Sequence, residues 1–129
     1  MIRTTLDKFF EADGVAVKSG GTPGSDYKDY SLADGERWIV EEFGGSASID
    51  QTEVELLYSE DNGSTWENPF DSNSTKIRCI HLQNGGTVVQ RLDITFIGGT
   101  NHILRILVKN YNSVNEAEIT GFIRGQIGT

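Results

Sequence analysis

Hydrophobic and polar residues alternate with a period of two along much of the chain, which is the pattern of β-strands that pack one face on a core. The clearest case runs from Val54 to Tyr58: every second residue is apolar and expected to face a core, whereas Glu53, Glu55 and Leu57 are expected to face water. No segment has the spacing of an amphipathic helix of three turns. Similar segments predict further strands at 5–11, 14–17, 37–43, 76–82, 88–97, 102–111 and 117–124.

Glycine-rich turns separate these segments at 44–45, 84–86 and 98–101. The stretch 19–34 is rich in Gly, Ser, Asp and Tyr and is expected to be a long irregular loop that crosses between sheets. Strands with turns roughly every 8 to 15 residues are typical of sandwiches. The sequence therefore predicts an all-β protein, an antiparallel two-sheet β-sandwich of about eight strands with jelly-roll topology.

The alternation also assigns side chains to faces. In the segment 102–111, Leu104, Ile106 and Val108 are expected to point inward, and Arg105 and Lys109 to point outward. In the segment 76–82, Ile77 and Cys79 are expected to share one face, and Lys76 and Arg78 the other. Trp38 is followed in its strand by Ile39 and Val40 and is expected to be in the core.

The length of 129 residues predicts one domain, 1–129, large enough to bury a core of its own. The apolar content is 36%, and the 15 glycines point to many tight turns. Residues 1–13 are a candidate N-terminal arm, because Leu6, Phe9 and Phe10 are apolar and close to the terminus. No apolar run is long enough for a signal peptide or a membrane span, so we expect a protein that is not secreted by a signal peptide.

Charge is distributed unevenly along the chain. The net charge of −8 argues against nucleic acid and anionic membranes as partners. Residues 1–71 hold 16 acidic and 5 basic side chains, whereas residues 72–129 hold 3 acidic and 6 basic ones. Two interpretations are open: an acidic set of strands and loops within one sandwich, or an acidic face that meets a less acidic face on a neighbouring copy.

The octapeptide from Ser59 to Trp66, Ser-Glu-Asp-Asn-Gly-Ser-Thr-Trp, is the densest motif in the chain. It predicts a hairpin, in which Asp61 bonds backbone N–H groups two residues on, Gly63 supplies a positive φ, and Trp66 folds over the turn. The motif resembles the Asp-box of sialidase-type propellers, Ser-x-Asp-x-Gly-x-Thr-Trp, whose fourth defining residue is here Thr65. It occurs once, and the chain is too short for a propeller, so we expect a structural turn and no catalytic residue.

The chain offers few other candidate catalytic or metal-binding residues. Cys79 and His81 occupy alternate positions of one strand, and His102 is the one further histidine of the chain. These residues lack the number and spacing of ligands that zinc sites have, so no metal and no cofactor are predicted. The single cysteine excludes an intramolecular disulfide. No nucleophile motif is present, and the sequence predicts no enzyme. Acidic clusters at 26–34 and 60–67 are expected to be solvated loops; binding of Ca²⁺ is the alternative.

Three tyrosines are candidate contacts for a ligand. Tyr27 and Tyr30 lie in the expected long loop, and Tyr111 ends a strand among asparagines. Tyr and Asn are the residue types that sugar-binding sandwiches present to a pyranose ring. They are equally suited to anchor loops, with the ring packed and the hydroxyl in water.

As a whole the chain resembles the small jelly-roll proteins of tailed-bacteriophage virions, which decorate capsids or build adaptors and fibre tips. The segments that carry this resemblance are 38–43, 58–66, 104–111 and 118–125. It implies a non-enzymatic structural protein located in the virion, which associates with itself and with other virion proteins. In one such arrangement, the acidic stretch 26–36 and the basic pair Arg105 and Lys109 lie on opposing contact surfaces.

The alternative is a carbohydrate-binding, lectin-like module or receptor-binding domain, for which a glycan is the partner. This class shares the sandwich, the Asp-box hairpin and the exposed tyrosines, so the sequence alone separates the two classes poorly.

Overall fold

The structure, a computed structural model, describes residues 2–129, which form eight β-strands and contain no helix. The strands are β1 (Arg3–Val15), β2 (Gly24–Ser31), β3 (Arg37–Ala47), β4 (Thr52–Ser59), β5 (Lys76–Leu82), β6 (Thr87–Ile97), β7 (Ile103–Asn110) and β8 (Ala117–Gly128).

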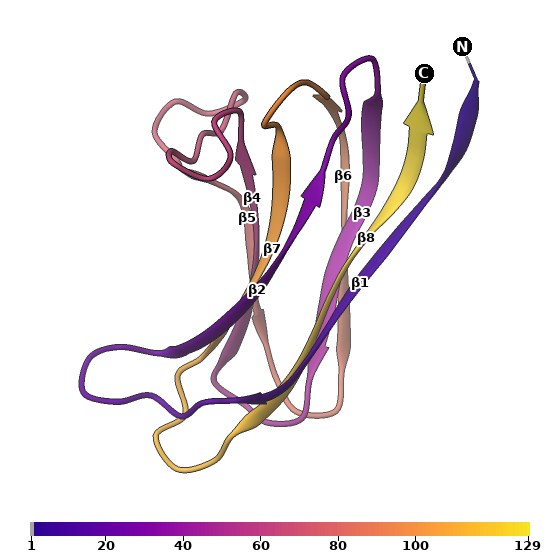
Figure 1. Ribbon diagram of the computed structural model, residues 1–129. Helices are drawn as coiled ribbons and strands as arrows, with labels where there is room; N and C mark the ends of the chain where they lie inside the picture. Colours follow the sequence, from indigo (N-terminus) through magenta and orange to yellow (C-terminus); the bar gives the residue numbers. More distant parts are fainter. Residues whose placement is uncertain (1) are drawn as a thin grey trace.

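Two antiparallel four-stranded sheets face each other (Figure 1). Sheet 1 has the order β1-β8-β3-β6, and sheet 2 has the order β2-β7-β4-β5. Every connection crosses from one sheet to the other except the one between β4 and β5. In this arrangement β1 pairs with β8, β2 with β7, β3 with β6 and β4 with β5, as in a long ribbon rolled into two sheets. The predicted β-sandwich is confirmed, and its strand order is that of a jelly roll.

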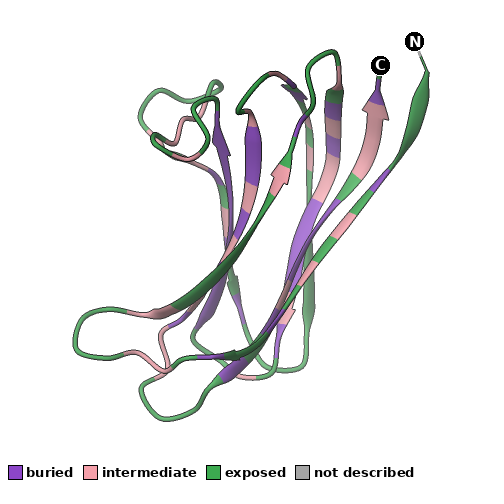
Figure 2. Cartoon of the chain, viewed as in Figure 1, coloured by how far each residue is buried: buried purple, intermediate pink, exposed green. Residues whose placement is uncertain are grey.

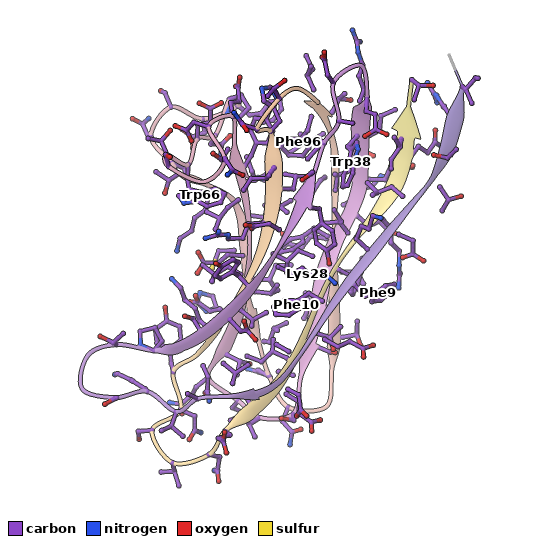
Figure 3. The ribbon with its side chains drawn as sticks, viewed as in Figure 1. Phe9, Phe10, Lys28, Trp38, Trp66 and Phe96 are labelled. Atoms are coloured by element: carbon purple, nitrogen blue, oxygen red, sulfur yellow. The ribbon has the colours of Figure 1, made fainter. Side chains whose placement is uncertain are left out.

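The core lies between the sheets, and Figure 2 shows the buried residues gathered on the central strands. The inward residues of β4 and β7 are fully buried, as the alternation predicts. Trp38 is buried in β3, opposite Phe96 of β6, and the two lie at the same end of the molecule (Figure 3). Gly121 lets the sheets approach closely, because an added Cβ there would lie 2.5 Å from Ile106 Cγ2 and 2.7 Å from Val54 Cγ2.

The expected loop at 19–34 is wrong over half of its length, because residues 24–31 form β2. This strand pairs residue by residue with β7 at the edge of sheet 2. Most of its side chains are exposed, and only Tyr30 packs against the core (Figure 2). An edge strand with so little burial carries no apolar alternation, so its sequence resembles that of a loop.

The two opening segments predicted at 5–11 and 14–17 fall largely in one strand, which ends before residues 16 and 17. β1 runs from Arg3 to Val15, and the break between the segments is a β-bulge at which Gly14 has a φ of +62°. Residues 3–12, which belong to the candidate N-terminal arm, pair with β8 of the same chain. Phe10 packs against the core, whereas Phe9 points to the opposite side of the sheet (Figure 3).

The expected faces of β5 need one correction. A register shift in the pairing with β4 places Ile77 inward together with Ile80 and Leu82. Cys79 therefore lies on the outer face, beside His81, and not on the face of Ile77. A bulge of this kind inverts the alternation for the residues beyond it.

Candidate functional surfaces

The Asp-box forms a turn held together by its own side chains. Asp61 accepts hydrogen bonds from the backbone N–H of Thr65 at 2.8 Å, from the Thr65 hydroxyl at 2.5 Å and from the Ser59 hydroxyl at 2.7 Å. These bonds, the Thr65 hydroxyl first, lower the pKa of Asp61 to about 2. The prediction that Asp61 bonds the N–H two residues on is wrong, because the N–H of Gly63 donates to the Ser59 hydroxyl at 2.9 Å. Asp61 therefore acts as a turn residue whose acceptor atoms are already occupied.

Trp66 ties this turn to sheet 2. Gly63 has a φ of +87°, and an added Cβ there would lie 3.3 Å from the indole Cζ2, so the ring folds over the turn as predicted. The guanidinium carbon of Arg105 in β7 lies 4.5 Å from the centre of the Trp66 ring and 3.7 Å from that of Tyr27 in β2. Arg105 is thus stacked between two aromatic rings from separate segments.

Arg105 and Lys109 form their ion pairs within the chain. Asp29 is the cross-strand partner of Arg105, and its two oxygens accept from the guanidinium at 2.6 and 2.9 Å. This hydrogen bonding raises the pKa of Arg105. Lys109 Nζ lies 2.9 Å from Glu55. The expected arrangement, with the stretch 26–36 and these two bases on opposing surfaces, is therefore wrong, because β2 and β7 lie side by side.

Glu55 is the centre of a buried ion-pair cluster on the outer face of sheet 2. Its side chain is 1% exposed, and its two oxygens lie 3.1 Å from Lys76 Nζ and 2.9 Å from Lys109 Nζ. Burial lowers the pKa of Lys76, but the hydrogen bond and charge of Glu55 outweigh it, so that pKa is raised. The expectation that Glu53, Glu55 and Leu57 face water is wrong, because long side chains from β5 and β7 cover the central strand β4.

The topology brings part of the uneven charge together. The jelly roll pairs early strands with late ones, and ion pairs between them join Asp7 to Arg124, Asp29 to Arg105, and Glu55 to Lys109. Lys76, the first base of the second half, also pairs with Glu55. Four bases of the second half are thus paired with acids of the first half within one chain, which keeps a net charge of −8.

Three side chains with metal-ligating atoms meet further along the same face. Glu53 of β4 lies opposite His81 of β5, and its Oε1 is 3.2 Å from His81 Nδ1. Cys79 lies two residues before His81, on the same side. The hydroxyl of Tyr111 donates to the other oxygen of Glu53 at 3.4 Å. Burial first, then the charges of Glu53 and its neighbour Glu55, raise the pKa of Cys79 to about 11.

The sequence does not reveal the role of Glu53 in this group. It lies 26 positions from Cys79 in the chain, and only the register of β4 against β5 brings the two together. A carboxylate on an alternating strand is the ordinary pattern of an exposed face, so nothing in the pattern marks Glu53 as a partner of Cys79 and His81.

A carboxyl pair joins Glu60, inside the Asp-box, to Glu67, which follows it. The side chains of Glu60 and Glu67 share a hydrogen bond, which, followed by burial, raises the pKa of Glu67. His102 Nε2 lies 3.5 Å from Glu60, and its Nδ1 lies 3.1 Å from the hydroxyl of Tyr58. Burial, then the charges of the two glutamates, raise the pKa of Tyr58 to about 12. The cluster opens into a hollow of about 310 Å³ and can hold a proton between its carboxyl groups.

The three candidate tyrosines differ in exposure. The hydroxyl of Tyr30 donates to the carbonyl of Phe9 at 3.0 Å and so links β2 to β1 across the two sheets. Tyr111 is half-buried and contacts Glu53. Tyr30 and Tyr111 therefore anchor the structure. Tyr27 is 53% exposed and presents one ring face to solvent opposite Arg105.

An apolar row crosses the outer face of sheet 1. The row consists of Phe9, Phe122, Gly44 and Val89, which are successive cross-strand partners on β1, β8, β3 and β6. The Phe9 and Phe122 rings are 5.5 Å apart, and Phe122 lies over Gly44, where an added Cβ would be 2.6 Å from Cζ. Phe9 and Val89 are 42% and 44% exposed. The row thus ends in exposed apolar side chains at both edges of the sheet.

Comparison of the chain with known protein families, with curated proteins and with solved structures finds no match. Within residues 2–129 no helix has the length and apolar character needed to cross a membrane.

Proposed function

We propose that this protein is a non-enzymatic structural protein that acts as a homo-oligomer, and specifically an accessory protein of a bacteriophage virion such as a capsid decoration protein. The observation that carries self-association is the apolar row on sheet 1. The jelly-roll strand order and the resemblance of the sequence to virion accessory proteins support the more specific role.

Exposed apolar side chains at sheet edges are a liability for a monomer, and soluble proteins usually protect edge strands with charges, prolines or bulges. Here β6 has a bulge at Asp93, where φ is +53°, but Val88 and Val89 are exposed on the stretch before it. Burying Phe9 and Val89 against another surface would remove this apolar area from water.

A second copy of the chain is the partner that fits this face. Arg124 lies over Phe9 and Phe122, with its guanidinium carbon 5.4 and 4.4 Å from the ring centres, and is 3.8 Å from Asp7. The row is therefore bordered by charges of both signs. With a two-fold axis beside this pair, Arg124 of one copy would face Asp7 of the other.

The test compares two valine substitutions of the same chemistry. Val89→Lys adds a charge to the row, on an edge strand where lysine is well tolerated. Val114→Lys adds the same charge to an exposed position in the loop between β7 and β8. Multi-angle light scattering should give an oligomer for the native chain and for Val114→Lys, and a lower mass for Val89→Lys. Equal masses for all three would reject the row as the interface.

The virion role has its own test. Particles purified by density gradient from cells that produce the protein should contain it in a fixed stoichiometric ratio to the major capsid protein, and Val89→Lys should reduce this ratio. A protein that stays entirely at the top of the gradient, in its native oligomeric form, would contradict the virion role and leave self-association intact.

One observation favours the alternative, a glycan-binding module. Tyr27 presents an exposed ring on a rigid support formed by Arg105 and Trp66, which suits stacking on a pyranose. A glycan array distinguishes the two functions: binding that is lost in Tyr27→Ala and retained in Tyr111→Phe would favour the module.

A further inference from the structure

Three side chains of different ligand chemistry converge on the outer face of sheet 2, at the end of β4 distant from the Asp-box. Glu53 offers a carboxylate, Cys79 a thiol and His81 an imidazole, and these ligand atoms lie within 4.8 Å of one another. Two come from alternate positions of β5 and one from the register position opposite. The rigid ladder between β4 and β5 therefore fixes all three backbones.

The surroundings suit a metal ion. Glu53 is buried and held from behind by the hydroxyl of Tyr111, so its carboxylate is already oriented. Its other oxygen faces His81. A hollow of about 570 Å³ is lined by Glu53, His81 and Tyr111 among others, and it gives an ion and water access to two of the three proposed ligands.

We propose that Glu53, Cys79 and His81 bind a transition-metal dication, with zinc as the best fit. Thiolate, imidazole and carboxylate are the three ligand types of zinc sites, and three protein ligands leave a fourth position for water or a ligand from solution. Calcium and magnesium take six or more oxygens, and only Glu53 in this group supplies them. The site is independent of the apolar row, which lies on the other sheet.

The distances require little rearrangement. Ligands about 2.0 to 2.3 Å from a tetrahedral zinc ion are roughly 3.3 to 3.8 Å apart. Glu53 and His81 already meet at 3.2 Å. All three ligand atoms lie within 4.8 Å of one another, so the widest separation must close by no more than about 1 to 1.5 Å, and the side chain of His81, 82% exposed, can move.

Cobalt is the probe, because a thiolate bound to Co²⁺ gives a charge-transfer absorption band and a tetrahedral ion gives intense visible bands. Cys79 is the single cysteine of the chain, so the charge-transfer band reports on this site alone. The reduced, metal-free protein titrated with Co²⁺ should develop both bands, and Zn²⁺ should abolish them. Cys79→Ser should lose the charge-transfer band.

His81→Asn decides the proposal, since this exposed side chain can be replaced without disturbing the core. It should weaken cobalt binding at least about tenfold, and Glu53→Gln should do the same. Glu118→Gln, the same change at an exposed site on sheet 1, should leave binding unaltered. A native protein without a charge-transfer band, or a band unaffected by His81→Asn, would overturn the site. Thermal unfolding of each variant checks that it is folded.

Discussion

Replacing Glu55 by glutamine should destabilise the protein more than any surface substitution of a glutamate. The side chain of Glu55 is 1% exposed and its oxygens contact two ammonium groups. Glutamine keeps the shape but removes the negative charge. Lys76 and Lys109 would then face each other across a neutral amide, without the anion that holds them over β4.

The magnitude follows from burial. A hydrogen bond to a charged group contributes about 1.5 to 3 kcal/mol, and breaking a fully buried pair costs about 3 to 5 kcal/mol. Lys76 and Lys109 are 41% and 23% exposed, so their ammonium groups can partly return to water, which lowers the cost. We expect Glu55→Gln to reduce the free energy of unfolding by about 2 to 3 kcal/mol, and Tm by roughly 10 °C.

Urea unfolding at a fixed protein concentration measures this loss, with Glu118→Gln as the exposed control, expected to stay within about 0.5 kcal/mol of the native chain. The triple variant Glu55→Met, Lys76→Met and Lys109→Met should recover most of the stability, because apolar side chains of similar volume replace the whole buried cluster with little loss. If Glu55→Gln were as stable as the control, the buried cluster would contribute nothing and this reasoning would be refuted.

Three further predictions concern the Asp-box and its support. The pKa of Asp61 falls from 3.8 to about 2 on folding, so its ionised form stabilises the fold above about pH 4, and this stabilisation is lost as pH falls through about 2. Asp61→Asn should therefore lower Tm at neutral pH and make Tm decline less steeply in acid, as measured by circular dichroism. Gly63→Ala should lower the free energy of unfolding more than Gly20→Ala does. Both glycines have positive φ, but only an alanine at position 63 would place its Cβ against Trp66. Equal losses of stability in chemical denaturation would exclude the indole contact. Arg105→Lys should lower the free energy of unfolding by about 1 to 2 kcal/mol and alter Trp66 fluorescence, because lysine cannot form the bidentate, stacked geometry. Unchanged fluorescence would contradict the stacking.

Much of the fold follows from the sequence because most strands bury one face. The alternation in β4, β7 and β8 places their inward residues correctly, and the Asp-box motif locates the one hairpin within a sheet. β2 is not predicted, because an exposed edge strand does not show the alternation of apolar and polar residues. The faces of β5 are misjudged because the bulge near Ile77 depends on pairing with β4, which the local sequence does not encode.

The candidate surfaces are harder to predict, because they depend on which strands are neighbours. Nothing local joins Arg105 to Asp29, Glu55 to Lys109, or Glu53 to Cys79. The strand order of the jelly roll creates these groups. Charges that suggest an intermolecular interface when counted along the sequence thus become partners within one chain.

The native mass in solution tests the central claim most directly. Sedimentation equilibrium over a concentration series from the low micromolar range upward should give a stable multiple of the 14.2 kDa chain. Val89→Lys should shift that equilibrium toward the single chain. A native protein that sediments as a 14.2 kDa monomer at every concentration would contradict the proposal that it is a self-assembling structural protein.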